Sequence, residues 1–173
     1  LGEYLKFLNR DVRREEDKIH LVYVPVPFHQ LIPALLRGQG DIAASLLTVT
    51  PQREEVVAFA SGGKLEVAEL VVGHKSVQNL KTLDDLSGTE IYVLRASSYL
   101  EHLHALNKAF KARSMQPVKI VKADPDLQGE DILELVNAGA VKLTIVDDYQ
   151  ARLWSKVLPD IRVYEHLQLA SGN

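Results

Sequence analysis

One short stretch of the sequence combines side chains that are suited to holding an anion. Thr48, Thr50 and Arg53 lie close together in the chain. The planar guanidinium group of an arginine pairs bidentately with a carboxylate, and threonine hydroxyls supply further hydrogen-bond donors. The alternative is a surface arginine paired with Glu54 or Glu55, with both threonines serving only a turn. The stretch therefore predicts either an anion site or an ordinary helix start.

A second polar group lies in the loop between a predicted strand and a predicted helix. Ser97 or Ser98 can cap this helix, and the free amide groups of its first turn then attract an anion. Arg95 lies in the same loop and adds positive charge. Capping alone is the alternative role for either serine, so the loop forms an anion site only if it faces a cleft.

Two neighbouring acidic residues mark the end of a later predicted strand. Asp147 is placed at the carboxyl end of that strand, where it can accept hydrogen bonds from an ammonium group. Asp148 is the alternative acceptor, and one of the two can instead cap the helix that begins at Tyr149. An arginine and an aspartate facing one gap would together suit a molecule that carries both charges.

The composition excludes several classes of protein. The chain has 173 residues, a net charge of -3 and no cysteine, so disulfides, thiolate metal sites and thiol nucleophiles are excluded. We find no basic cluster of the kind that binds nucleic acid or an anionic membrane surface. No run of about 18 apolar residues indicates a membrane span. These features are typical of an ordinary folded domain.

The sequence contains none of the common catalytic motifs. It has no Gly-x-Ser-x-Gly elbow, no phosphate-binding loop and no His-Glu-x-x-His pattern. His102 and His104 lie two residues apart on a predicted helix, so their side chains point to different faces and do not form a zinc pair. We therefore expect no catalysis by this chain, no metal and no cofactor.

Hydrophobic spacing predicts helices that alternate with strands, which is typical of an α/β fold with parallel strands. The predicted helices cover residues 1–15, 28–36, 83–86, 99–112, 130–138 and 149–157. The predicted strands cover residues 20–26, 41–47, 90–94, 118–123, 141–146 and 161–164, with two extended segments at 56–60 and 65–73.

These elements suggest two α/β lobes around a cleft. Residues 1–72 form the first lobe, 73–166 the second, and 167–173 begin a return toward the first. Ligands of open α/β sheets bind outside the carboxyl ends of the strands, and pockets favour domain interfaces. The loops after residues 47, 94 and 146 are therefore expected to face a common cleft.

Three segments carry a family resemblance. Residues 40–53 with 57–60 contain a Gly-Asp turn, a Thr-Val-Thr-Pro-Gln-Arg run and a Val-Ala-Phe-Ala run. Residues 83–93 read Leu-Asp-Asp-Leu-Ser-Gly-Thr-Glu-Ile-Tyr-Val, and residues 136–147 end in Thr-Ile-Val-Asp. In this order and spacing they resemble the family 3 extracellular solute-binding proteins. The resemblance implies the type II periplasmic binding protein fold, with the first lobe lacking its first strand and its C-terminal return.

The resemblance assigns a role to each polar group. Arg53 with the nearby threonines would hold the α-carboxylate of an amino acid or peptide, the serine loop would meet it from the second lobe, and Asp147 would bind the ammonium group. Leu46 stands where many amino-acid binders have glycine, and it would crowd backbone contacts to a ligand amine. The implied ligand-binding residues are Thr48, Thr50, Arg53, Ser97, Ser98 and Asp147, with Leu46, Arg95 and Asp148 as further candidates.

Residues 130–136, 146–148 and 158–163 look most like the sensor domain of membrane-bound lytic transglycosylase F. This implies a periplasmic domain, tethered to the outer membrane in the full-length protein, that binds an amino acid or a muropeptide stem peptide. It would regulate a fused peptidoglycan lytic transglycosylase, whose catalytic domain lies outside this sequence, by cleft closure. The alternatives are an amino-acid receptor that serves an ABC transporter permease and a dehydratase-like enzyme on the same scaffold.

Overall fold

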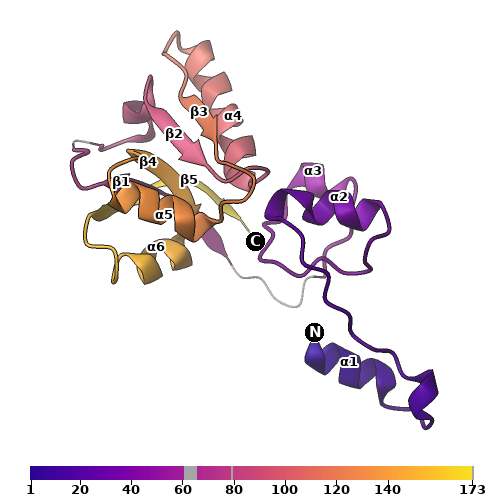
Figure 1. The fold of residues 1–173 in the computed structure, drawn as a ribbon. Coiled ribbons are helices and arrows are strands. Elements are labelled where there is room, and N and C mark those ends of the chain that lie inside the picture. Colours follow the sequence, from indigo (N-terminus) through magenta and orange to yellow (C-terminus); the bar gives the residue numbers. More distant parts are fainter. Residues whose placement is uncertain (61–65, 79, 173) are drawn as a thin grey trace.

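A five-stranded sheet organises most of the chain (Figure 1). The computed structural model describes residues 1–60, 66–78 and 80–172. The strands lie in the order β3-β2-β4-β1-β5. Their bounds are Val67–His74 for β1, Glu90–Val93 for β2, Lys119–Lys122 for β3, Leu143–Asp147 for β4 and Ile161–Gly172 for β5.

The connections of the sheet create a switch point between β2 and β4. Strand β2 pairs in parallel with both β3 and β4, whereas β1 is antiparallel to β4 and β5. Helix α4 (Ser98–Ala112) leads from β2 outward to β3, and α5 (Gly129–Asn137) leads back to β4. Because these two connections diverge, a crevice opens at the carboxyl ends of β2 and β4. The loop at Leu94–Ser97 and the end of β4 meet there.

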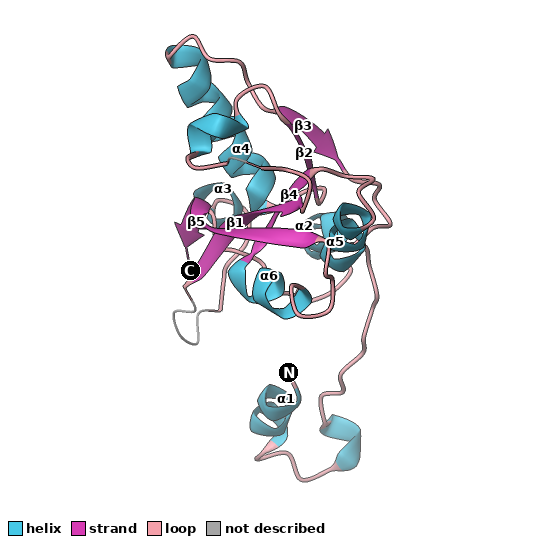
Figure 2. Cartoon of the chain, turned by 90° about the vertical axis from the view of Figure 1, so that its left-hand side faces the viewer, coloured by secondary structure: helices cyan, strands magenta, loops and turns pink. Residues whose placement is uncertain are grey.

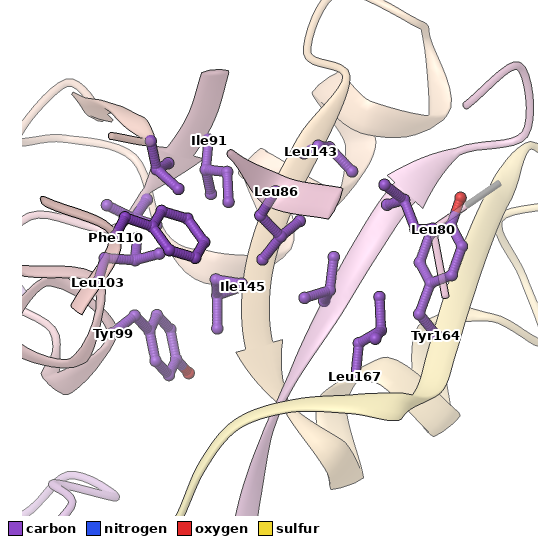
Figure 3. Close-up of a cluster of buried hydrophobic side chains, with 13 residues drawn as sticks. Leu80, Leu86, Ile91, Tyr99, Leu103, Phe110, Leu143, Ile145, Tyr164 and Leu167 are labelled. Carbon is purple, nitrogen blue, oxygen red and sulfur yellow. The ribbon is translucent and has the colours of Figure 1, made fainter. Parts of the chain in front are cut away.

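Two buried clusters cover the two faces of the sheet. Alternate residues of a strand point to opposite faces, so Val71 joins one cluster while Leu70 and Val72 join the other. The larger cluster packs α4 onto the sheet through Leu103 and Phe110, and Figure 3 shows both on the same side of the cluster as Ile91 and Ile145. The smaller cluster seats α5 and α6 (Asp148–Trp154), so the sheet is covered on both sides.

The N-terminal third of the chain is helix and loop. Helix α1 (Gly2–Asn9) stands apart from the sheet in both views (Figure 1 and Figure 2), and none of its residues is buried. Two 3₁₀ turns, Glu15–Asp17 and Phe28–Gln30, precede α2 (Leu31–Leu36). The short helix α3 (Pro51–Glu54) begins with proline at its first position and with Thr50 as its N-cap, whose hydroxyl accepts from the Arg53 amide. A further 3₁₀ turn, Leu83–Leu86, enters β2.

The predicted strands at 20–26 and 41–47 are wrong, because the structure assigns no strand to either segment or to 56–60. Side chains that favour a strand do not suffice when no neighbouring strand completes the hydrogen-bonded ladder. Val22 and Tyr23 are 78% and 75% exposed, which shows that no sheet covers this segment. The predicted helix over 1–15 ends at Asn9, where α1 gives way to a turn and the 3₁₀ segment.

The strands of the second half were predicted correctly in type, and β2, β3 and β4 lie within one or two residues of their expected bounds. Strand β1 starts at Val67; the expected start at residue 65 lies outside the described residues. The strand expected at 161–164 continues to Gly172, and His166 to Leu169 alternate polar and apolar side chains as expected for a strand. The expected lobe boundary at residue 72 falls within β1, a single strand in the middle of the sheet.

Candidate functional site

A cavity lies at the switch point of the sheet, where the segment before α3 meets the carboxyl ends of β2 and β4. Its volume is about 280 Å³. The segment 45–53 forms one wall, and the starts of α4, α5 and α6 form the other. Its lining includes Phe28, Ser45, Leu46, Thr48, Arg53, Ser97, Ser98, Tyr99, Gln128, Glu130, Asp147, Tyr149 and Gln150. The expected convergence of the three loops is therefore present.

Arg53 bridges the two walls of the cavity. Its side chain comes from α3, is only 6% exposed, and donates from Nη1 to the Thr48 carbonyl at 2.7 Å and from Nη2 to the Ala96 carbonyl at 2.9 Å. Its Nε lies 3.9 Å from a carboxylate oxygen of Glu101. Burial lowers the pKa of Arg53, and Glu101 opposes that effect. The partners are not Glu54 or Glu55, so this arginine is not a simple surface ion pair.

The backbone that receives Arg53 is unusual. Ala96 has a φ of 60°, in the left-handed region that costs an L-residue roughly 1–2 kcal/mol. Its carbonyl accepts from the guanidinium of Arg53 across the cavity. A strained residue persists only where its surroundings fix it, and such residues cluster at functional sites. The loop between β2 and α4 is therefore held in a defined shape.

Neither serine of this loop caps α4 with its side chain. Ser97 occupies the N-cap position, but its hydroxyl donates to the Leu94 carbonyl at 2.7 Å. The Ser98 hydroxyl donates to Glu69 Oε1 at 2.7 Å. The first amide groups of a helix have no partner within the helix, and both serines line the cavity. The groups of this loop that suit an anion are therefore the backbone amides at the N-terminus of α4, and not the serine hydroxyls.

Asp147 is a buried acid with an unsatisfied acceptor. Its residue is 6% exposed, and its amide donates to the Tyr99 hydroxyl at 3.2 Å. Among the described residues, its Oδ1 has no hydrogen-bond partner. Burial raises the pKa of Asp147, the hydroxyls of Tyr99 and Tyr149 oppose this, and the nearby charges of Glu69 and Asp148 add to it. Buried hydrogen-bond acceptors nearly always have a partner, so we expect Oδ1 to accept a hydrogen bond from a group that enters the cavity.

The structure separates the remaining candidates. Leu46 lines the cavity although its side chain is 67% exposed, so it borders the opening. Thr50 caps α3 and lines a second, smaller cavity rather than this one. Arg95 points to the Ala123 carbonyl, and Asp148 pairs with Arg152 at 3.3 Å; neither lines the main cavity. Of the two adjacent acids, the geometry therefore favours Asp147.

Sequence reasoning missed a buried carboxylate beside the site. Glu69 lies on β1 and is 2% exposed, with Oε1 accepting from Ser98 and Oε2 lying 2.7 Å from Nδ1 of His102. The sequence did carry a signal, since a glutamate interrupts the apolar run of Val67 to Val72 and must find partners if it is buried. His102 was weighed only as a zinc ligand, and the structure makes it the partner of Glu69.

Two properties bear on the kind of protein. The described residues contain no cluster of three or more His, Asp or Glu side chains arranged to hold a metal ion. Among the helices in that part of the chain, none combines the length and the apolar character needed to span a bilayer.

Comparison with known proteins agrees with this geometry. A membrane-bound lytic murein transglycosylase F of Maricaulis maris is 32% identical over 137 residues, which cover 79% of this chain and 28% of that protein. The chain therefore matches less than a third of that relative's length. An ancestral arginine-binding protein bound to arginine aligns with a TM-score of 0.69 at 24% identity, over 84% of this chain and 61% of that one.

A further structural neighbour is AbpA from Streptococcus pneumoniae, an amino acid ABC transporter substrate-binding protein bound to L-arginine. It aligns with a TM-score of 0.68 at 17% identity, over 96% of this chain and 63% of that one. These likenesses show a type II periplasmic binding protein fold. Residues 8–128 match a single family description. The chain is a solute-binding domain and belongs to the bacterial extracellular solute-binding proteins, family 3.

Proposed function

We propose that this chain is a periplasmic ligand-sensing domain that binds a small zwitterion between Arg53 and Asp147. The observation that carries the proposal is the cavity itself, which has a buried guanidinium on one wall and a buried, unsatisfied carboxylate oxygen on the other. An amino acid or the end of a peptide carries the two complementary charges. The neighbours that bind arginine support this class of ligand.

The carboxylate of the ligand would lie against Arg53 and the start of α4. Two of the five N–H donors of the guanidinium are used on the carbonyls of Thr48 and Ala96, which leaves donors for an anion. The amide groups of Ser98 and Tyr99 begin a helix of 15 residues, whose N-terminus favours negative charge. Thr48, Ser97 and Ser98 are proposed ligand contacts on this side, and Thr50 is proposed to act only by capping α3.

The ammonium group of the ligand would lie against Asp147. Oδ1 of this residue is buried and has no partner among the described residues, so an N–H donor from the ligand would satisfy it. Positive charge at this position would also offset the burial of the carboxylate. The hydrogen bond to Oδ1 and the charge compensation both require that the two walls of the cavity lie close together. Ligand binding favours this closed state only through contacts that the open state lacks.

We further propose that this binding regulates a fused peptidoglycan lytic transglycosylase, with a cell-wall stem peptide as the ligand. The similarity to a membrane-bound lytic murein transglycosylase F supports this role. The match covers only 28% of that protein, which leaves most of its length for a separate catalytic domain. The second candidate is the amino-acid receptor of an ABC transporter, and the likeness to AbpA favours it. Outer-membrane tethering is part of the first proposal and not of the second.

Isothermal titration calorimetry against the common L-amino acids and a muropeptide stem tetrapeptide tests the proposal. Arg53→Ala and Asp147→Asn should each weaken binding by about tenfold or more, because each removes a charge-assisted hydrogen bond. Arg113→Ala is the matched control, since Arg113 pairs with Asp84 on the surface at 2.7 Å. Selective binding of the tetrapeptide would support the regulatory role, and binding of free amino acids alone would support the receptor. Unchanged affinity in both site variants would refute the assigned site.

A further inference from the structure

Two buried carboxylates lie side by side in the sheet, Asp147 in the lining of the main cavity and Glu69 in the lining of the second, smaller cavity. Glu69 on β1 and Asp147 on β4 are direct register partners in the antiparallel pair, and such partners point to the same face of the sheet. That face is the one covered by α4, since Val71 and Ile145 on the same face both belong to the cluster that packs against α4. Both acids are buried, at 2% and 6% exposure. Like charges directly opposite one another destabilise a sheet.

The two carboxylates have unequal partners. Both oxygens of Glu69 are engaged, one by the Ser98 hydroxyl and one by the His102 ring, each at 2.7 Å. Oδ1 of Asp147 has no partner in the part of the chain that the structure describes. The fold therefore stabilises the carboxylate of Glu69 by hydrogen bonds and leaves that of Asp147 to be completed from the cavity.

We propose that Glu69 is a positioning residue of the ammonium subsite, which acts through Asp147 by placing a second negative charge beside it on the neighbouring strand. The inference rests on the proposed function, in which a ligand ammonium group contacts Asp147. A single cation between the walls would relieve the repulsion between both acids, so the paired carboxylates favour a primary ammonium over a neutral donor. Ser98 thereby serves both sides of the cavity, with its amide toward the anion and its hydroxyl on Glu69.

The other charged and titratable groups near Asp147 have different positions. Tyr99 of α4 and Tyr149 of α6 face it with hydroxyls, and Asp148 at the start of α6 adds negative charge. Glu130 of α5 lines the same cavity, and its charge contributes to the raised pKa of Tyr149. Asp148 already pairs with Arg152, and Glu130 lies at the exposed edge. Glu69 is thus the deeply buried acid that shares a sheet face with Asp147.

A purely structural role for Glu69 makes a different prediction. In that case the residue only anchors α4 to β1 through Ser98 and His102. Glu69→Gln separates the two roles, because the amide has the same shape, its oxygen still accepts from Ser98, and its nitrogen can donate to the His102 ring. The substitution keeps the anchor and removes the charge. Glu69→Asp keeps the charge on a shorter side chain, and Glu90→Gln is a control at an exposed position on β2.

Carboxyl ¹³C NMR titration of the ligand-free chain tests this coupling without any ligand, with the Asp147 resonance assigned from its absence in Asp147→Asn. Removing the neighbouring charge in Glu69→Gln should lower the pKa of Asp147, while the part of the elevation that burial causes remains. Glu69→Asp should retain most of the elevation, and Glu90→Gln should change nothing. If Asp147 titrates at the same pH in Glu69→Gln and in wild type, the proposal is overturned. If Glu69→Gln does not fold, Glu69→Asp decides, and a lowered pKa of Asp147 in that variant overturns the proposal.

Calorimetry then separates this inference from the proposed function. Glu69→Gln should weaken binding of the amino acids and of the stem tetrapeptide by about tenfold, because the ligand ammonium group then faces one negative charge in place of two. Their Nα-acetylated forms, which lack the α-ammonium group, should bind wild type and variant equally weakly when the side chains carry no amino group. A shifted titration with no binding of any probe to wild type would overturn the subsite together with the proposed function. A binding wild type whose affinity is unchanged in Glu69→Gln would overturn the role of Glu69 alone.

Discussion

The bridge made by Arg53 predicts a measurable contribution to stability. Arg53→Met keeps a similar apolar stem but removes the guanidinium that donates to the carbonyls of Thr48 and Ala96. A hydrogen bond from a charged donor contributes about 1.5–3 kcal/mol, and we take the lower figure because both bonds are only partly buried. Two such bonds give about 3 kcal/mol, which for a chain of this size lowers the melting temperature by roughly 6–12 °C.

Differential scanning calorimetry at neutral pH measures this effect. The matched control is Arg113→Met, which removes an arginine from an ion pair whose two side chains are each 49% exposed and which should change the melting temperature little. Arg53→Lys retains the charge but replaces the planar fork with a point donor, so it should fall between wild type and Arg53→Met. If Arg53→Met melts within about 2 °C of Arg113→Met, the two walls are not joined by this arginine.

Three further predictions follow from the described contacts. Ala96→Val should lower the free energy of unfolding by about 1–2 kcal/mol in equilibrium urea titration, because a β-branched side chain tolerates a φ of 60° worse than alanine does; an unchanged midpoint would mean that the loop is not held in the left-handed region. Phe110→Ala should cost about 3–5 kcal/mol by the same method, since its side chain is completely buried between α4 and the sheet, and a loss below about 1 kcal/mol would contradict that packing. Asp147 has a folded-state pKa above its ordinary value of 3.8, so the folded state binds more protons and its stability falls as pH rises between the unfolded and folded pKa. Asp147→Asn should therefore melt higher than wild type at neutral pH and show a smaller difference below 3.8, and a difference of equal size at both pH values would refute the linkage.

The second half of the chain was predictable because its patterns are local. Strands β2, β3 and β4 follow short apolar runs, and α4 follows a helical spacing, so each element could be identified without its neighbours. The segment 20–26 has the same kind of composition but forms no strand. The difference is the presence of a pairing partner, which is a property of the fold and not of the segment.

The candidate site was predictable in part for the same reason. Ser97 follows β2 and Asp147 ends β4, and an α/β sheet brings the carboxyl ends of such parallel strands to one edge. Arg53 also lines the cavity, but it comes from α3, and the strand expected before it is not formed. The partner of Ser98 was not predictable, because Glu69 reaches it through the antiparallel placement of β1 between β4 and β5. The register of that pairing is set by tertiary packing, and a single sequence does not reveal it.

The exposed segment at 20–24 has a practical consequence. Val22, Tyr23 and Val24 are among its members and are between 58% and 78% exposed, outside every strand that the structure describes. Apolar side chains that are exposed together in this way can associate with another molecule. Self-association should therefore grow with protein concentration, and binding constants are best measured at several dilutions with light scattering alongside.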